Sequence, residues 1–503
     1  MLFLQNCVIA DGTGGELYKG GLLLEGGRIA EIVREGEEPP SGCEVMDLGG
    51  LTVAPGFVDA HSHFEATVLK NPRCRSLLAQ GVTTLVCGNC GFFHALSGSA
   101  GEYSWKDFKE YIEVFDKVRP NVNAILLAGH NSLRCAVMGD ENRAPSREEM
   151  EEMKSLLKET LSLGAGGLTF GLTYIPGKFS RTEELIELAS CLKGTGKLVA
   201  AHMRSEGDTL NEALQEMFTV AKSAGVPFHV SHIKTIFQRN FHKLPRMLEL
   251  LKEAKEDGIR ITADRYPYIY SSTTLRQTLP PPYDLMTDSE VKTFLAEEEG
   301  FAALEKDMTK SPRDLPTTII LFGEYVGRTI KEISSLTGES VERICCRLLK
   351  EAPHGRVAYL CMSEENMLEL IRKPFVCCGS DGLSMSLDDP SELAHPRAVG
   401  SLPRFFRIAA DLLGVAEAVR KCSALPAEIF RIPERGYIRK GLIADLTVID
   451  PGKVESKADF LGNELLPYGI EKVFLGGEMV YDRSAADDVT ALGKGRYIPI
   501  PNQ

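Results

Sequence analysis

Short apolar stretches separated by turns begin and end the chain. Two Gly-Gly pairs, at 26–27 and 476–477, favour tight hairpin turns between neighbouring stretches. The stretches have the length of single strands and lie at 3–10, 20–25, 28–33, 444–450, 472–475 and 478–481. Neither end is long enough to bury a core alone. We therefore expect residues 1–54 and 436–503 to pair into one small β-sandwich domain.

The middle of the chain repeats a different pattern, in which an apolar strand is followed by a polar loop and an amphipathic helix. Strands that alternate with helices build parallel βαβ units, and about eight such units predict a closed (β/α)8 barrel. We therefore predict an α/β fold with a TIM-type barrel over residues 55–435. The candidate strands are 52–59, 82–87, 123–128, 166–170, 197–201, 226–231, 259–264, 356–361 and 374–378.

These nine candidate strands are one more than a barrel of eight βα units needs. The irregular segment of about 279–352 begins Leu-Pro-Pro-Pro-Tyr and predicts an inserted lid or subdomain between late barrel strands. We expect the strand that follows it, 356–361, to lie outside the barrel. Two capping boxes, Ser146 to Glu149 and Ser180 to Glu183, predict helices over 150–163 and 184–193.

Composition limits the kinds of partner and the cellular compartment that we expect. The net charge of −13 argues against a nucleic acid as the main partner. No stretch approaches the roughly 20 apolar residues of a membrane span, and the first residues lack a basic region typical of a signal peptide. The 13 cysteines are scattered and odd in number, which favours a reducing cytoplasm over a disulfide framework. The oligomeric state stays open, a homo-oligomer included.

Metal-binding residue types gather where the predicted barrel strands end. In such barrels the active site lies at the C-terminal strand ends. Histidine, cysteine and aspartate all suit zinc, and six of these residues at five strand ends are hard to produce by chance. They are His61, His63, Cys90, His202, His232 and Asp381.

Each of these residues also has a simpler interpretation. A histidine at a strand end is often a hydrogen-bonded polar residue without a ligand role, and Asp381 alone could cap the next helix. The Cys87-x-x-Cys90 spacing fits a redox pair or half of a structural zinc site, but no second Cys-x-x-Cys completes one. Cys87 lies inside the apolar strand, so we expect it to pack and Cys90 to be the ligand.

Several short motifs, in order along nearly the whole chain, resemble the N-acyl-D-amino-acid deacylases of the amidohydrolase superfamily. The Asn-Cys-Gly motif is the most specific, because most of the superfamily bridges two metals with a carbamylated lysine where this branch has cysteine. The motifs are His61-Ser-His63 after Ala54-Pro-Gly-Phe57, Gly88-Asn89-Cys90-Gly91, Gly171-Leu-Thr-Tyr174, His202-Met-Arg204, Ser231-His232 with Lys234, Tyr266-Pro-Tyr268, Gly379-Ser-Asp381-Gly and His395-Pro-Arg397.

The resemblance implies a role for each site residue. It implies a tight zinc on Cys90, His202 and His232, a second weaker metal position near His61, His63 and Asp381, and Asp381 as the general base and acid. It further implies contacts to the carboxylate of a small N-acyl amino acid substrate from Lys234, Tyr174, Tyr266, Ser272 and Arg397. Preference for the D enantiomer rests on the resemblance alone.

Three functional hypotheses remain at this point. The leading one is a zinc-dependent amidohydrolase that deacylates N-acyl-D-amino acids. The second is a cyclic amide hydrolase of the dihydroorotase or hydantoinase type, although the fourth strand end offers Tyr174 and no ligand lysine. The third is a non-catalytic amidohydrolase-like binding protein, which would be expected to lose metal ligands that this chain retains.

Overall fold

Parallel strands from the middle of the chain form the barrel. The computed structural model describes residues 1–37, 40–383 and 395–503. The strands pair in the orders β6-β7-β10 and β11-β12-β13-β14-β15-β19. They are β6 (Phe57–Asp59), β7 (Val82–Cys87), β10 (Asn123–Leu126), β11 (Ala128–Gly129), β12 (Gly167–Gly171), β13 (Leu198–His202), β14 (Phe228–Val230), β15 (Ile261–Arg265) and β19 (Val376–Cys378).

Two local connections close the ring of strands. β10 and β11 follow each other directly along the chain. The backbone N–H of Ala60, just after β6, donates to the carbonyl of Cys378 in β19 at 3.1 Å. The last strand therefore returns to the first, as the predicted TIM-type α/β barrel requires.

Helices follow the barrel strands and cover the ring from outside. Their apolar sides belong to the same buried cluster as the outward side chains of the strands. The main helices are α3 (Phe108–Val118), α4 (His130–Met138), α5 (Arg147–Ser162), α6 (Thr182–Ala189), α7 (Leu210–Ala224), α8 (Leu244–Glu256), α13 (Glu364–Arg372), α14 (Arg397–Leu413), α15 (Val415–Cys422) and α16 (Ala424–Ile429).

Strands from both ends of the chain share one sheet, in the order β22-β21-β20-β5-β1-β2-β3, with β4 beside β1. Leu446 of β20 pairs with Pro55 of β5, so the late strands continue the early ones. The limits of this domain, 1–54 and 436–503, stay a prediction. The strands are β1 (Leu2–Ile9), β2 (Tyr18–Glu25), β3 (Arg28–Arg34), β4 (Glu44–Asp47), β5 (Thr52–Pro55), β20 (Leu446–Ile449), β21 (Ile470–Leu475) and β22 (Glu478–Asp482).

The prediction of a single strand over 52–59 is wrong. The chain leaves the terminal sheet after β5 and enters the barrel at β6, and Gly56 lies between the two. A Cβ at Gly56 would lie 2.2 Å from Thr83 Oγ1, so the turn brings the backbone against β7 too closely for a side chain. Hydrophobic pattern alone cannot reveal this change of sheet, because both halves are buried.

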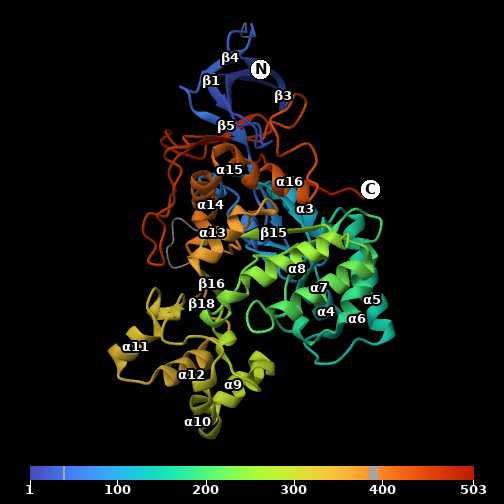
Figure 1. The fold of residues 1–503 in the computed structure, drawn as a ribbon, viewed down its shortest axis with the longest axis vertical. Helices are drawn as coiled ribbons and strands as arrows, with labels where there is room; N and C mark the ends of the chain where they lie inside the picture. The colour runs from blue at the N-terminus through green and yellow to red at the C-terminus, as the bar shows by residue number, and fades with distance from the viewer. Residues whose placement is uncertain (38–39, 384–394) are drawn as a thin grey trace.

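A helical insertion separates β15 from α13. Strand β18 (Arg356–Leu360) pairs antiparallel with β16 (Tyr270–Thr274) and β17 (Ile319–Ile320), which confirms that it lies outside the barrel. Figure 1 shows the insertion helices together at the end of the molecule opposite to the terminal sheet. They have a core of their own, which includes Leu295, Ile333 and Leu349. The helices are α9 (Asp288–Ala296), α10 (Glu298–Asp307), α11 (Ile330–Thr337) and α12 (Val341–Glu351).

The two predicted capping boxes have different outcomes. Ser146 caps α5, since its hydroxyl accepts from the N–H of Glu149 at 3.2 Å while the Glu149 carboxylate accepts from the Ser146 N–H at 2.6 Å. The second box is wrong. Ser180 donates its hydroxyl to the carbonyl of Gly177 at 2.6 Å and thereby closes the preceding 3-10 turn, and the N-cap of α6 is Arg181, whose side chain makes no cap hydrogen bond.

No helix in the described ranges has both the length and the apolar character of a membrane span. All 13 cysteines are free thiols.

Candidate metal centre

The six predicted ligands lie together at the C-terminal ends of the barrel strands. They form two sets, and in each set the ligand atoms lie within 4.8 Å of one another. We call Cys90, His202 and His232 the Cys–His–His group. We call His61, His63, Cys90 and Asp381 the His–His–Asp group. Cys90 belongs to both, so its sulfur lies between the two sets.

The Cys–His–His group has the spacing that zinc requires. Cys90 Sγ lies 3.7 Å from His202 Nδ1 and 3.4 Å from His232 Nε2. Tetrahedral bonds of about 2.3 Å to sulfur and about 2.0 Å to nitrogen would place sulfur and nitrogen about 3.5 Å apart. One thiol and two imidazoles therefore fit a zinc ion in both chemistry and separation.

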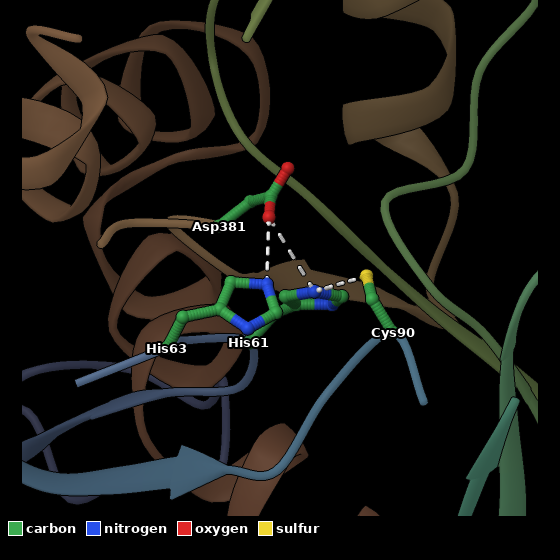
Figure 2. Close-up of side chains that lie close together, drawn as sticks. All are labelled: His61, His63, Cys90 and Asp381. Carbon is green, nitrogen blue, oxygen red and sulfur yellow. Dashed lines mark hydrogen bonds and ion pairs between the residues drawn. The ribbon is translucent and has the colours of Figure 1, made fainter. Parts of the chain in front are cut away.

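The His–His–Asp group is centred on one carboxylate oxygen. Asp381 Oδ1 lies 3.1 Å from His63 Nε2 and 3.6 Å from His61 Nε2. The same nitrogen of His61 lies 3.4 Å from Cys90 Sγ. Figure 2 shows Asp381 above the two imidazoles, with Cys90 on the far side of His61. These donors also suit a divalent metal.

Three of the candidate ligands have left-handed backbone conformations. The φ angles are 53° at Cys90, 38° at His232 and 52° at Asp381. Such angles are uncommon for residues other than glycine and cost roughly 1–2 kcal/mol each. Each of these residues follows its strand by two or three positions and lies in one of the two ligand groups, so the unusual turns belong to the site itself. Hydrophobic pattern gave no sign of this strain.

The thiol of Cys90 is held in a form suited to metal binding. Burial alone would raise its pKa, but the imidazoles of His61 and His232 hold the pKa of Cys90 well below the ordinary value. The metal ligand is the thiolate. The surrounding histidines therefore favour the binding form before any cation arrives.

A buried carboxylate that the sequence analysis missed supports both groups. Asp264 Oδ2 lies 3.2 Å from His61 Nδ1 and 2.9 Å from His229 Nε2. Its other oxygen accepts from the backbone N–H of His232 at 2.9 Å. Burial alone would raise the pKa of Asp264, but His61 and His229 hold it well below the ordinary value. The available signal was a lone carboxylate in the apolar strand 259–264.

A second carboxylate, Glu206, lies behind the Cys–His–His group. Glu206 Oε1 lies 3.0 Å from His232 Nδ1, and Glu206 Oε2 lies 3.7 Å from His202 Nε2. Lys234 forms an ion pair with Glu206 and lies 2.6 Å from His232 Nδ1. A carboxylate behind a ligating histidine orients the ring and strengthens the ligand. The sequence pattern alone had given Glu206 no role.

Asp381 is fixed from two sides. Arg397 Nη1 lies 2.8 Å from Asp381 Oδ2, and the Asp381 N–H donates to the carbonyl of His61 at 2.7 Å. Burial alone would raise the pKa of Asp381, but Arg397 and His63 hold it well below the ordinary value. The residue before Asp381 is also anchored, because Ser380 donates its N–H to Asp59 Oδ1 at 2.8 Å.

Two cavities that share several lining residues reach these groups. A cavity of about 400 Å³ is lined by His63, Cys90 and Asp381, together with Tyr174, Ser272 and Arg397. A narrow one of about 30 Å³ is lined by His202, His232 and Asp381, together with Tyr174, Lys234, Tyr266 and Ser272. All five residues predicted to contact the substrate therefore line at least one cavity. Lys234 and Arg397 are already engaged by Glu206 and Asp381.

Cys87, expected to pack rather than to bind metal, and the buried His130 make other contacts. Cys87 is buried in β7 with its sulfur 3.2 Å from Ser62 Oγ, and it belongs to neither ligand group. His130 lies 2.7 Å from Glu184, which also pairs with Arg134 at 3.0 Å.

The chain belongs to the amidohydrolase family, whose sequence profile matches residues 44–308. Within it, D-aminoacylase from Alcaligenes xylosoxydans xylosoxydans is 31% identical over 502 residues, covering 96% of this chain and 95% of that protein. N-acyl-D-aspartate deacylase from the same organism is 30% identical over 95% of this chain and 91% of its own length. The resemblance noted in the sequence is thereby confirmed.

A solved structure matches along the full length. N-acyl-D-glutamate deacylase from Bordetella bronchiseptica, complexed with zinc and a phosphonate inhibitor, has a TM-score of 0.82 with this chain. Its sequence identity is 29%, and 99% of each chain is covered. The fold is thus that of a deacylase barrel with its additional domain.

Proposed function

We propose that the chain is a zinc-dependent hydrolase that removes the acyl group from N-acyl-D-amino acids. One observation carries the proposal. Cys90 joins two adjacent ligand groups, and the carboxylate of one of them, Asp381, lines a cavity of about 400 Å³. Structural zinc sites are closed by four protein ligands, whereas catalytic sites keep an open position. The deacylase relatives indicate a linear amide as substrate.

The residues divide between holding metal and handling protons. Cys90, His202 and His232 would hold zinc tightly, and His61, His63 and Asp381 would offer a second, weaker position. Zinc bound there supplies Lewis acidity for the amide carbonyl and lowers the pKa of the attacking water toward neutrality.

Asp381 is the proposed general base and acid. Its carboxylate stays ionised at neutral pH because Arg397 and His63 hold its pKa low, so it can accept a proton from water. It would then donate that proton to the nitrogen of the leaving amine, provided that one oxygen reaches both atoms. Arg397 and the backbone N–H bond to His61 hold the carboxylate in place for both transfers.

The α-carboxylate of the substrate would be held beside the narrow cavity. Tyr174, Tyr266, Ser272 and Lys234 line it, and Ser272 Oγ is buried without a hydrogen-bond partner in the described part of the chain. Arg397 would contribute from the wider cavity, where its guanidinium lies 4.8 Å from the centre of the Tyr266 ring. Cationic and hydroxyl donors of this kind bind carboxylates.

A hydrolysis screen tests the proposal. Zinc-loaded protein is given N-acetyl and N-formyl derivatives of D- and L-amino acids beside hydantoins and dihydroorotate. We expect release of free D-amino acid from the linear amides, faster than from their L counterparts. Hydrolysis of the cyclic amides alone would establish the cyclic amide hydrolase instead. Absence of any hydrolysis by zinc-loaded protein would favour a binding protein.

We also propose a reducing cytoplasm as the place of action. The 13 free thiols support it, because an oxidising compartment favours disulfides. A homo-oligomer would be compatible with the site, since all the ligands come from one chain. Light scattering of the purified protein measures the oligomeric state.

A further inference from the structure

The wider cavity is walled on one side by the insertion. Strand β16 contributes Ser272, Thr273 and Thr274, and strand β18 contributes Arg356, which pairs with Thr274 across the antiparallel ladder. The 3-10 turn after β16 adds Arg276. The barrel supplies the ligands, whereas the insertion supplies most of the polar wall that a substrate would contact.

Three arginines and three aspartates line this cavity, and their pairing is uneven. Arg397 lies 2.8 Å from Asp381, and Arg276 lies 2.7 Å from Asp288. The third aspartate, Asp140, is exposed. Arg356 has no acid partner among the described residues, and its Nε is buried without a hydrogen-bond acceptor.

The unpaired guanidinium has a nearby like charge. Burial and the positive charge of Arg397 lower the pKa of Arg356, whereas Tyr174 and Asp381 raise it. A partly buried guanidinium without an anion is costly, and it is usually matched by a carboxylate or phosphate. Arg276 adds a second unmet donor on the same wall, since its Nη2 is also buried without an acceptor in the described ranges.

The proposed α-carboxylate site does not supply this anion. That carboxylate is assigned to the narrow cavity, which Arg356 does not line. A substrate with an apolar side chain and an acetyl group would displace water from the wider cavity and leave the guanidinium without any partner. Sites built to hydrogen-bond a polar group strongly reject substrates that lack it.

We propose that Arg356 binds a second carboxylate of the substrate, so that the chain prefers N-acyl amino acids with two carboxylates. The inference rests on the proposed deacylase function. The second carboxylate has two chemical sources. It belongs either to an acidic amino-acid side chain or to a dicarboxylic acyl group. Arg356 would hold it with its planar pair of N–H donors.

Four substrates distinguish the sources. The zinc-loaded protein is assayed with N-acetyl-D-glutamate, N-acetyl-D-aspartate, N-succinyl-D-leucine and, as the reference, N-acetyl-D-leucine. We expect at least one dicarboxylate to exceed the reference in kcat/KM by about 10-fold or more. A preference for the first two assigns the side chain, and a preference for the succinyl compound assigns the acyl group. Equal or faster hydrolysis of N-acetyl-D-leucine would overturn the inference while leaving the deacylase function intact.

Variants at Arg356 test the residue itself. In Arg356→Leu, the kcat/KM ratio of the preferred dicarboxylate to N-acetyl-D-leucine should fall by about 10- to 100-fold, mainly through KM. Arg356→Lys keeps the charge without the planar donors and should give an intermediate ratio. Arg343→Leu, on the outer side of α12, should keep the wild-type ratio, since Arg343 is half exposed and pairs with Glu305. An equal loss for both substrates in Arg356→Leu would show that Arg356 does not read the second carboxylate.

A binding measurement guards against a variant that merely misfolds. Zinc content and thermal unfolding are compared first, and the Kd values of both substrates are then measured by calorimetry in an Asp381→Asn background. Adding Arg356→Leu should raise the Kd of the dicarboxylate by about 10-fold or more relative to the Kd of N-acetyl-D-leucine. No change in relative Kd would reject the assignment. If wild type hydrolyses no N-acyl amino acid at all, the proposed function and this inference fail together.

Discussion

The Cys–His–His group and the His–His–Asp group share Cys90, but they keep their carboxylates in different places. In the first group Glu206 lies behind His202 and His232 and is neutralised by Lys234. In the second, Asp381 lies among the ligand atoms, borders the wider cavity and is paired with Arg397. A carboxylate behind the ligands strengthens metal binding. A carboxylate on the cavity can exchange protons with substrate and water.

Removing the shared residue should have the largest effect. Cys90→Ala takes a ligand from both groups, so we expect zinc to be lost and turnover to fall to the background level. Metal analysis by mass spectrometry measures the zinc per chain. Cys87→Ala is the matched control, because Cys87 is buried three residues earlier and belongs to neither group. Normal zinc in Cys90→Ala would remove Cys90 from the metal site.

A substitution at Asp381 separates proton transfer from metal binding. Asp381→Asn keeps the size of the side chain but cannot accept a proton, so kcat should fall by about 100- to 10,000-fold with zinc retained. Steady-state kinetics and metal analysis are made on the same preparation. Asp116→Asn, an exposed residue of α3, serves as the control. Near-normal kcat would assign the proton transfers to another group.

Glu206→Gln should act on metal affinity more than on the proton transfers. Loss of the carboxylate weakens the orientation of His232, so zinc affinity should fall by about 10- to 100-fold. The variant also leaves Lys234 as an unpaired buried charge, which costs about 3–5 kcal/mol of the free energy of unfolding. Competition with a zinc chelator and denaturant unfolding measure the two effects.

A double variant distinguishes the two causes. Glu206→Gln with Lys234→Met removes both partners of the buried pair, so it should recover part of the lost free energy of unfolding. Zinc affinity should stay low, because the carboxylate is still missing. Recovery of zinc affinity in the double variant would contradict the role of Glu206 behind His232.

Lys421 is a buried lysine with no acid partner among the described residues, in contrast to Lys234 beside Glu206, and its removal should have the smallest effect. Lys421 donates to the carbonyls of Lys373 and Val376, and burial lowers the pKa of Lys421 to about 8. The unfolded chain binds the proton of the Lys421 ammonium more tightly than the folded chain does. The stability that the neutral lysine gives at high pH is therefore lost as pH falls from about 10.5 through about 8. The charged form of Lys421 therefore destabilises the folded state at neutral pH.

Unfolding across this pH range checks the sign. Relative to Lys421→Met, the free energy of unfolding of wild type should rise by about 1–3 kcal/mol between pH 8 and pH 10.5. Using the difference between the two proteins cancels the titration of other groups. A difference that stays constant over this range would show that the lysine is charged in the folded protein.

The sequence predicted the fold and the clustering of the ligands because both follow from periodicity. An alternation of strands and helices specifies a barrel, and a barrel specifies that strand ends meet. His61, Cys90, His232 and Asp381 lie near one another for that reason. Their roles as ligands remain the proposal made above.

What the sequence could not supply are contacts made across long separations. Asp264 supports His61 from 203 residues away. Arg356 borders the same cavity as Cys90 only because the insertion turns back toward the barrel. The change of sheet at Gly56 and the failed cap at Ser180 have a related cause, since each depends on a neighbour that the local pattern does not specify.

Strand β5 pairs with β1 along one edge and with β20 along the other. On the ribosome, β5 emerges early, and β20 emerges only after the whole barrel has been synthesised. Throughout that interval the nascent chain presents an unpaired strand edge, which is a template for pairing with other chains. Chaperone protection during translation should therefore matter more for this protein than for one whose small sheet is complete before its barrel begins.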